Sequence, residues 1–147
     1  MTADLALWRD ERDISRALTG FARAMDARDW VAARAILSDD ACGELGTGPL
    51  TGPEAILGCI RHYLDGCGPT QHLLGNLLID LDGDQAESRC YVSDMHLGAG
   101  DRAQHSFVTL GDYHDQWRRI DGVWRMTFRR KFNRGHIGSF DVFGLDR

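Results

Sequence analysis

Residues 111–124 read GDYHDQWRRIDGVW, and this stretch decides how the second half of the chain is expected to fold. An Asp-Gly pair between two strand-like runs is a strong short-range signal for a β-hairpin. Asp121-Gly122 supplies this signal here, and Asp82-Gly83-Asp84 supplies it a second time. We therefore expect two long antiparallel hairpins. Their strands are expected at residues 72–81, 85–97, 104–120 and 123–132.

Upstream of the hairpins, the apolar residues follow a helical period. Between residues 12 and 29 they recur at intervals of four, three and four, at Ile14, Leu18, Phe21 and Met25. This spacing places them on one stripe of a helix, so we expect a first helix there.

Two shorter helices are expected next. Asp29 can cap a second helix over residues 30–37, and the Ser38-Asp39-Asp40 cluster is expected to end it. A Thr-Gly-Pro-Glu start predicts a third helix over residues 53–64, since proline and an acid both suit the first turn.

This order of elements predicts an α+β fold. The strands of the meander should form one strongly bent antiparallel sheet, and the three N-terminal helices should pack against one face of it. The 147 residues fit one domain, and the sequence shows no linker or repeat. Apolar residues in the tail, residues 133–147, indicate that it docks, either over a pocket mouth or across a subunit interface.

Composition excludes several classes of protein. The hydrophobic fraction is 43%, the charged fraction is 27%, and no apolar run is long enough to span a bilayer, so no membrane partner is expected. The net charge is −5, and the basic run at residues 129–131 is too local to track a nucleic acid. An acidic N-terminus without an apolar stretch shows no secretory signal, which leads us to expect a cytoplasmic protein.

The metal-binding residue types lack the usual spacing. Four cysteines and six histidines are present, but neither CxxC nor HExxH occurs. Without a secretory signal, we expect reduced, mostly buried thiols rather than disulfides. The sequence therefore predicts neither a metal site nor a cofactor.

Several segments together resemble the SnoaL-like family of the nuclear-transport-factor-type cone fold. They are MDARDW (residues 25–30), TQHLLGN (70–76), DGD (82–84) and GDYHDQWRRIDGVW (111–124). Within that superfamily, the likeness is greatest to the scytalone dehydratases, through the TQH and IDGVW segments. It is more distant to the lindane dehydrochlorinases and bile-acid dehydratases. The resemblance implies one cone-shaped SnoaL-like domain over residues 1–147.

The resemblance also implies an active-site pair. In these enzymes an aspartate near the end of the first helix pairs with a histidine at the start of the first long strand, and Asp26 and His72 match those positions. A second catalytic histidine matches His96, although a slip of two residues would move that match to Asp94. A substrate-binding asparagine of the dehydratases falls on Tyr113, and Met25 stands where a pocket tyrosine would be. A different substrate is therefore expected.

These residue types suit proton transfer. An aspartate held against an imidazole fixes its tautomer and leaves the other ring nitrogen free to act as a base. A leaving group or developing oxyanion then needs a nearby donor, for which His96, Tyr113 and Arg129 are candidates. A period of two places Asp115 on the same face as Tyr113. We therefore expect Asp115 to lie inside the cone and to pair with Arg129. The residues expected to bind the substrate are Tyr113, Arg129, Asp94 and Asp115.

The resulting hypothesis is a cofactor-independent lyase, of the dehydratase type, acting on a small cyclic or polyketide-like hydrophobic molecule. An isomerase or polyketide cyclase remains an alternative, because each also begins with proton removal. A non-catalytic ligand binder, or a subunit resembling the small subunit of ring-hydroxylating dioxygenases, remains open because this fold hosts many functions. A homodimer or homotrimer is expected.

Overall fold

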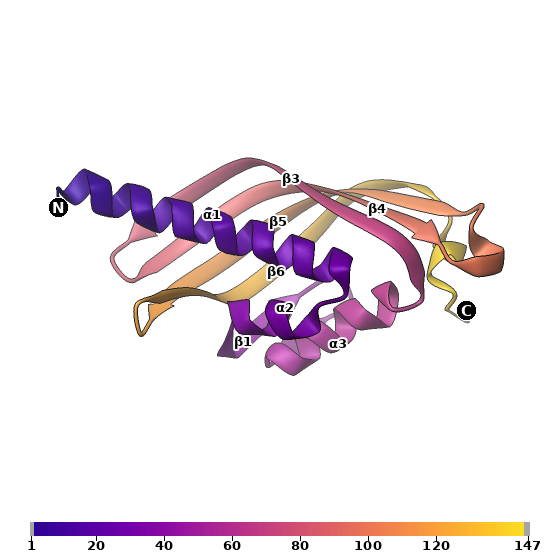
Figure 1. Ribbon diagram of the computed structural model, residues 1–147, viewed down its shortest axis with the longest axis horizontal. Helices are drawn as coiled ribbons and strands as arrows, with labels where there is room; N and C mark the ends of the chain where they lie inside the picture. The colour runs from indigo at the N-terminus through magenta and orange to yellow at the C-terminus, as the bar shows by residue number, and fades with distance from the viewer. Residues whose placement is uncertain (1, 146–147) are drawn as a thin grey trace.

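The computed structural model describes residues 2–145 and shows helices packed against the inner side of a curved sheet (Figure 1). The helices are α1 (Ala3–Ala27), α2 (Trp30–Ile36) and α3 (Pro53–Leu64). The strands are β1 (Leu37–Glu44), β2 (Pro49–Thr51), β3 (Cys67–Asp82), β4 (Gln85–Gly98), β5 (Ser106–Ile120) and β6 (Val123–Gly138). Two short 3₁₀ segments are η1 (Gly100–Arg102) and η2 (Phe140–Phe143). This arrangement confirms the expected α+β cone.

The sheet has the strand order β2-β1-β6-β5-β4-β3. Strands β3 to β6 form the expected antiparallel meander, but β1 runs parallel to β6. The sheet is therefore mixed and open, and α1 lies across its inner side (Figure 1). Both predicted turns occur where the sequence placed them. Asp121 and Gly122 have φ values of 50° and 80°, as a two-residue turn of type I′ requires.

The helix predictions differ from the structure mainly at the start of α1, which begins at Ala3 rather than near residue 12. The early turns carry few buried side chains, so the apolar stripe did not reveal them. Asp10 connects the N-terminal half of α1 to the β5–β6 hairpin, because its carboxylate accepts a hydrogen bond from Trp124 Nε1 at 2.9 Å and forms an ion pair with Arg119. Asp29 caps α2 as expected by accepting from the Ala32 amide.

The first two strands were missed from the sequence. Residues 38–40, expected only to end a helix, continue into β1, which pairs with β2 on one side and β6 on the other. Ser38 and Ala41 are buried there, whereas Asp39 and Asp40 are exposed. Two adjacent exposed acids break the alternating pattern, which explains why this strand was not recognised.

The predicted tail is partly a strand. Strand β6 runs to Gly138, six residues beyond the expected end at residue 132, and η2 follows it. Val142 and Phe143 are buried against Phe107 of β5. Residues 146 and 147 of the predicted tail lie outside the described residues.

The main core joins the stripe of α1 to the inner side of the sheet. Ile14, Leu18 and Phe21 pack in one cluster with Trp117 and Met126. This packing fixes α1 over the meander and brings its C-terminal end close to the start of β3. None of the helices among residues 2–145 has the length and apolar character needed to cross a membrane.

Candidate active site

A pocket of about 240 Å³ lies between the sheet and the ends of α1 and α3. Its apolar wall includes Met25, Leu64, Phe107, Phe140 and Phe143. The last two belong to η2, so the C-terminal segment lines this pocket. The polar residues of its wall are Thr47, Tyr63, His72, Asp94, His96, Thr109, Tyr113, Arg129, Lys131 and Asn133. Such a mostly apolar hollow with convergent polar groups is typical of a small-molecule site.

The structure brings Asp26 and His72 together. His72 Nδ1 lies 2.7 Å from Asp26 Oδ1, and the His72 backbone amide donates to Asp26 Oδ2 at 3.0 Å. The His72 side chain is only 5% exposed, whereas Asp26 lies behind it and is not part of the pocket wall. Burial alone would raise the pKa of Asp26, but the hydrogen bonds from His72 outweigh it and lower that pKa.

An ionised Asp26 fixes the tautomer of His72. The carboxylate can only accept, so Nδ1 carries the ring proton and Nε2 keeps a free lone pair. In this state His72 has the protonation that a general base requires.

Two residues that the sequence reasoning did not select hold this pair in place. The Thr70 hydroxyl donates to Asp26 Oδ1 at 3.0 Å, and Arg28 donates to Thr70 Oγ1 at 2.7 Å. Arg28 also donates to the carbonyl oxygens of Met25 and Gly68, so it ties the end of α1 to β3. Both residues lie in segments that carry the family resemblance.

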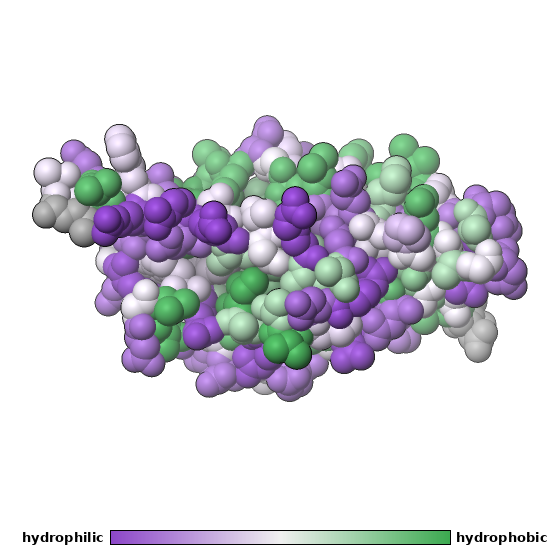
Figure 2. Space-filling model, viewed as in Figure 1, coloured by the Kyte–Doolittle hydropathy of each residue, from purple (hydrophilic) through white to green (hydrophobic). Residues whose placement is uncertain are grey.

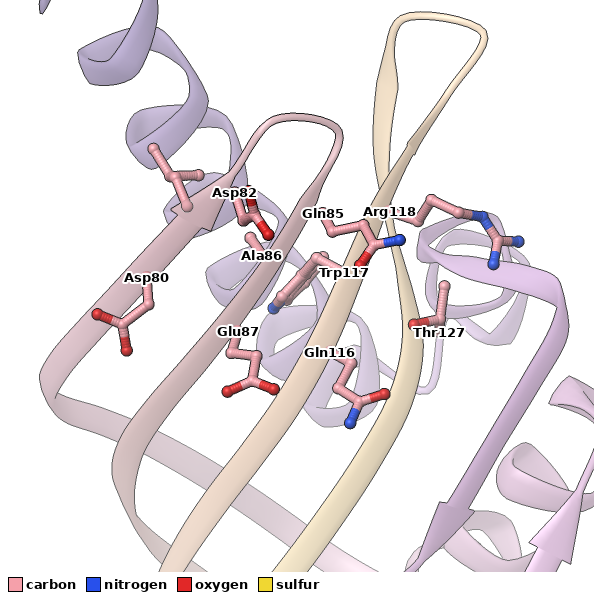
Figure 3. Close-up of a pocket in the computed structure, with 10 residues that line it drawn as sticks. Asp80, Asp82, Gln85, Ala86, Glu87, Gln116, Trp117, Arg118 and Thr127 are labelled. Atoms are coloured by element: carbon pink, nitrogen blue, oxygen red, sulfur yellow. The ribbon is translucent and has the colours of Figure 1, made fainter.

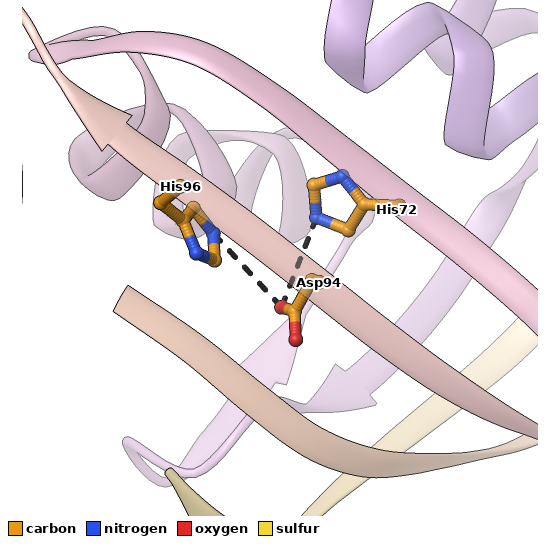
Figure 4. Close-up of side chains that lie close together, drawn as sticks. All are labelled: His72, Asp94 and His96. Atoms are coloured by element: carbon orange, nitrogen blue, oxygen red, sulfur yellow. Dashed lines mark ion pairs between the residues drawn. The ribbon is translucent and has the colours of Figure 1, made fainter. Parts of the chain in front are cut away.

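Asp94 and His96 lie in the same pocket, on the inner face of β4. Asp94 Oδ2 is 3.9 Å from His72 Nε2 and also 3.9 Å from His96 Nε2 (Figure 4). These three ligand-type atoms all lie within 4.8 Å of one another, so the group could hold a metal ion. The sequence left open whether His96 or Asp94 matches the second histidine of the family, and both residues lie at the site.

His96 is held in its neutral form. Its Nδ1 lies 3.0 Å from the carbonyl oxygen of Phe107, which can only accept, so Nδ1 carries the proton. Burial lowers the pKa of His96, and this effect outweighs the opposing influence of Asp94 and of the Phe107 carbonyl.

Asp94 has two close donors that sequence reasoning missed. Lys131 Nζ lies 2.5 Å from Asp94 Oδ2, and the Thr109 hydroxyl donates to Asp94 Oδ1. Thr109 stands directly opposite Asp94 in the β4–β5 register. Lys131 lies two residues beyond Arg129, on the same face of β6. The alternation along β6 could have indicated Lys131, but its partner depends on the pairing register.

The predicted pair of Asp115 and Arg129 is present and buried. Arg129 Nε and Nη2 donate to the two Asp115 oxygens at 2.8 and 2.9 Å. Burial raises the pKa of Asp115, although the nearby Arg129 acts to lower it. Burial alone would lower the pKa of Arg129, but the Asp115 carboxylate outweighs burial and raises it. The two parallel hydrogen bonds are those of an ion pair. The expectation that Asp115 binds the substrate is wrong, because Asp115 lies behind Arg129 and does not line the pocket, whereas Asp94, Tyr113 and Arg129 do.

Tyr113 forms part of the same wall. The Arg129 guanidinium stacks over its ring at 3.7 Å from the ring centre. Tyr113 is buried, and burial raises the pKa of its phenol, so the hydroxyl keeps its proton at neutral pH. It can therefore act as a hydrogen-bond donor in the pocket.

A second hollow, of about 480 Å³, lies at the other end of the sheet, beside the hairpin turns (Figure 3). Its wall is more polar and includes Asp80, Asp82, Glu87, Gln116 and Arg118. All five of these residues lie in or beside open solvent, and no histidine lines the hollow. The smaller apolar pocket is therefore the better candidate for chemistry.

Comparisons with known proteins identify the family and the fold. The sequence model of the SnoaL-like domain matches residues 7–130. No protein of curated function matches the chain significantly.

Solved structures with the same fold include three from the genus Novosphingobium. A proposed aromatic ring hydroxylase from N. aromaticivorans is 24% identical, with a TM-score of 0.81, covering 91% of this chain and 96% of that one. A proposed scytalone dehydratase from the same species is 20% identical, with a TM-score of 0.83, covering 94% and 92%. A type 3 hexachlorocyclohexane dehydrochlorinase from N. barchaimii is 19% identical, with a TM-score of 0.82, covering 93% and 94%.

Proposed function

Since the chain belongs to the SnoaL-like domain family, we propose that it is a lyase that uses Asp26 and His72 to remove a proton from a small hydrophobic molecule. The observation that carries this proposal is the 2.7 Å contact between His72 Nδ1 and Asp26 Oδ1 beside the pocket. It leaves His72 Nε2 as a free base in an apolar hollow. Solved structures of this fold include proteins named as dehydratases and dehydrochlorinases, which agrees with such chemistry.

The proposed step is an elimination. His72 Nε2 takes a proton from carbon, and the electrons of the C–H bond form a carbon–carbon double bond. A hydroxide departs with the electrons of its own bond and takes up a proton to become water, whereas a halide leaves as the anion. The imidazolium loses its proton to the hydroxide or to solvent, which restores the base. Asp26 stabilises the imidazolium that results, and a donor of the pocket receives the leaving group.

Several groups of the pocket can receive that negative charge. Arg129 and Lys131 are cations, and Tyr113 is a protonated phenol. Each cation already pairs with a carboxylate, Arg129 with Asp115 and Lys131 with Asp94, and each can donate a hydrogen bond to a departing anion or to a developing enolate oxygen. Asp115 holds Arg129 in position from behind. His96 and Asp94 face His72 and would contact the reacting part of the substrate.

The pocket volume indicates the class of substrate. About 240 Å³ lies below the usual range for drug-sized ligands, so a molecule of one or two rings is the best fit. The phenylalanines of the wall favour an apolar ring. We propose a hydroxylated or halogenated cyclic compound as the substrate class, with no cofactor required for the reaction.

The substitution Asp26→Asn tests the role of the pair while preserving its shape. Asparagine cannot balance an imidazolium, so we expect turnover to fall by about 10²- to 10⁴-fold. The assay incubates the protein in D₂O with a panel of hydroxylated and halogenated cyclic ketones. NMR follows deuterium incorporation, and water or halide release is measured in parallel.

The exposed histidine His62 provides the matched control, and His62→Gln should keep full activity. Deuterium incorporation without release of a leaving group would show an isomerase or cyclase instead. Tight binding without either reaction would show a ligand-binding protein and would overturn the proposal.

We also propose that the chain forms a homodimer or homotrimer through the outer face of its sheet. One side of the meander is covered by helices, while the other carries exposed apolar side chains. They are Leu73, Tyr91, Met95, Leu97, Leu110, Phe132 and Ile137. Figure 2 shows part of this apolar surface over β3, next to the hydrophilic outer side of α1. Exposed apolar patches of this kind mark protein interfaces, and a second copy offers the same face.

The substitution Leu110→Lys should therefore reduce the oligomer to monomers, because it places a charge at the centre of this face. Leu110 is 55% exposed. Sedimentation or light scattering gives the mass of the particle. Leu7→Lys on α1, at a leucine of similar exposure, is the control and should leave the mass unchanged. A monomeric wild-type chain would contradict the proposal.

The four cysteine thiols, all within the described part of the chain, are free. Only Cys90 is buried, and the other three are half-buried, so the expectation of mostly buried thiols was only partly met. Free thiols are typical of a reducing compartment, and we propose a cytoplasmic location.

A further inference from the structure

We propose that His72, Asp94 and His96 form a binding site for a divalent transition metal ion, with Zn²⁺ as the ion that fits the donor set best. Two imidazole nitrogens and one carboxylate oxygen are donors that zinc accepts. The three residues face one another from adjacent strands, as Figure 4 shows. This site lacks any spacing motif, because one ligand comes from β3 and two from β4.

The strand register builds the group. His72 of β3 stands directly opposite Asp94 of β4 in the antiparallel pairing. His96 follows Asp94 by two residues, so both side chains leave the same face of β4. All three ligands therefore come from the paired stretch of the edge strand β3 and its neighbour β4, where the register fixes their relative positions.

Both histidines present the correct nitrogen. Each Nδ1 lies against an oxygen that can accept its proton, Asp26 Oδ1 for His72 and the Phe107 carbonyl for His96. Each Nε2 therefore carries a lone pair and faces Asp94. In histidines that bind metals, the N–H of the other ring nitrogen almost always donates a hydrogen bond in this way, which fixes the ring and makes the ligand nitrogen more basic.

The distances require a small adjustment. The two Nε2 atoms each lie 3.9 Å from Asp94 Oδ2. Zinc bonds of about 2.0–2.2 Å in a tetrahedral site need donor atoms roughly 3.3–3.5 Å apart. A contraction of about half an ångström closes this difference for the two pairs with Asp94. The two Nε2 atoms lie within 4.8 Å of each other and must approach by up to about 1.4 Å, for which a metal ion would supply the attraction.

Lys131 is the competing cation. Its ammonium lies 2.5 Å from Asp94 Oδ2, the oxygen that would bind the metal. The side chain is 15% exposed and lines the pocket, so it can turn toward the pocket when the oxygen is taken. The repulsion between two cations weakens metal binding in the natural chain. Removal of this ammonium should strengthen it.

If His72 is the base of the proposed function, metal binding would also affect catalysis. His72 Nε2 cannot bind a metal and accept a proton at the same time. Bound Zn²⁺ would therefore inhibit the elimination by occupying the base. Metal binding itself requires no turnover, so the two proposals can fail separately.

Calorimetric titration of the chelator-treated protein with ZnCl₂ tests the site, and Co²⁺ absorption reports on the ligands of the bound ion. We expect one ion per chain. His96→Gln should weaken binding at least about tenfold, since it removes one of three ligands. Lys131→Met should strengthen it by a similar factor, because it removes the competing charge. His62→Gln and His114→Gln, at exposed histidines, are the controls and should bind like the natural chain.

Two results would overturn the proposal. One is zinc binding that His96→Gln leaves unchanged, whatever the surface controls do, and the other is the absence of any binding to Lys131→Met. Asp94→Asn serves as a second ligand variant, and circular dichroism confirms that each variant is folded. Zinc binding without activity on any compound would defeat the proposed function alone. Turnover that zinc does not inhibit would defeat the site alone.

Discussion

The substitution His72→Ala is expected to lower the rate of proton removal by about 10²- to 10⁴-fold, which is the usual contribution of a positioned general base. Asp26 orients the imidazole through a 2.7 Å contact with Nδ1, which leaves the lone pair of Nε2 to act as the base. Alanine offers no substitute for that lone pair. The rate of water or halide release, compared between an ordinary substrate and one deuterated at the reacting carbon, measures this step, because removal of deuterium is slower than removal of hydrogen.

The variant should keep its fold, because the His72 backbone amide still donates to Asp26. Thermal unfolding and His62→Ala, at an exposed histidine, provide the controls. An unchanged rate in folded His72→Ala would assign the base to another residue of the pocket. His96 would then be the first candidate, since its Nε2 also carries a lone pair.

The second large effect is expected for stability. Asp115→Ala leaves the buried guanidinium of Arg129 without its partner, and both side chains are almost fully shielded from solvent. Breaking a buried pair by removing one partner costs about 3–5 kcal/mol in the free energy of unfolding. Urea unfolding at neutral pH measures this loss.

A double variant separates the charge from the packing. Asp115→Leu combined with Arg129→Met removes both charges and fills the space with apolar atoms, so it should be considerably more stable than Asp115→Ala. A loss below about 1 kcal/mol in the single variant would show that Arg129 finds another partner or solvent.

Much of the fold follows from local sequence patterns. The apolar stripe of α1 and the two Asp-Gly turns predicted the helical face and both hairpins, because each depends on neighbouring residues. Strand β1 was missed because its pairing with β6 depends on a long-range contact that no local pattern reveals. The end of β6 was missed for a related reason, since its last residues are mostly polar and pair with the apolar start of β5.

The site shows the same division. The alternation along β5 predicted that Asp115 lies inside, and the register then places it opposite Arg129. The resemblance to SnoaL-like proteins, rather than any local pattern, pointed to Asp26 and His72. Thr109 and Lys131 were missed because their contact with Asp94 depends on how three strands align.

The state of the His72 ring tests the central claim most directly. Nitrogen NMR of ¹⁵N-labelled histidines distinguishes the two neutral tautomers. We expect His72 to carry its proton on Nδ1, bonded to Asp26, with Nε2 unprotonated, and we expect Asp26→Asn to disturb this signal. A ring protonated on Nε2 in the natural chain would contradict the account, because that nitrogen could not accept a proton from a substrate.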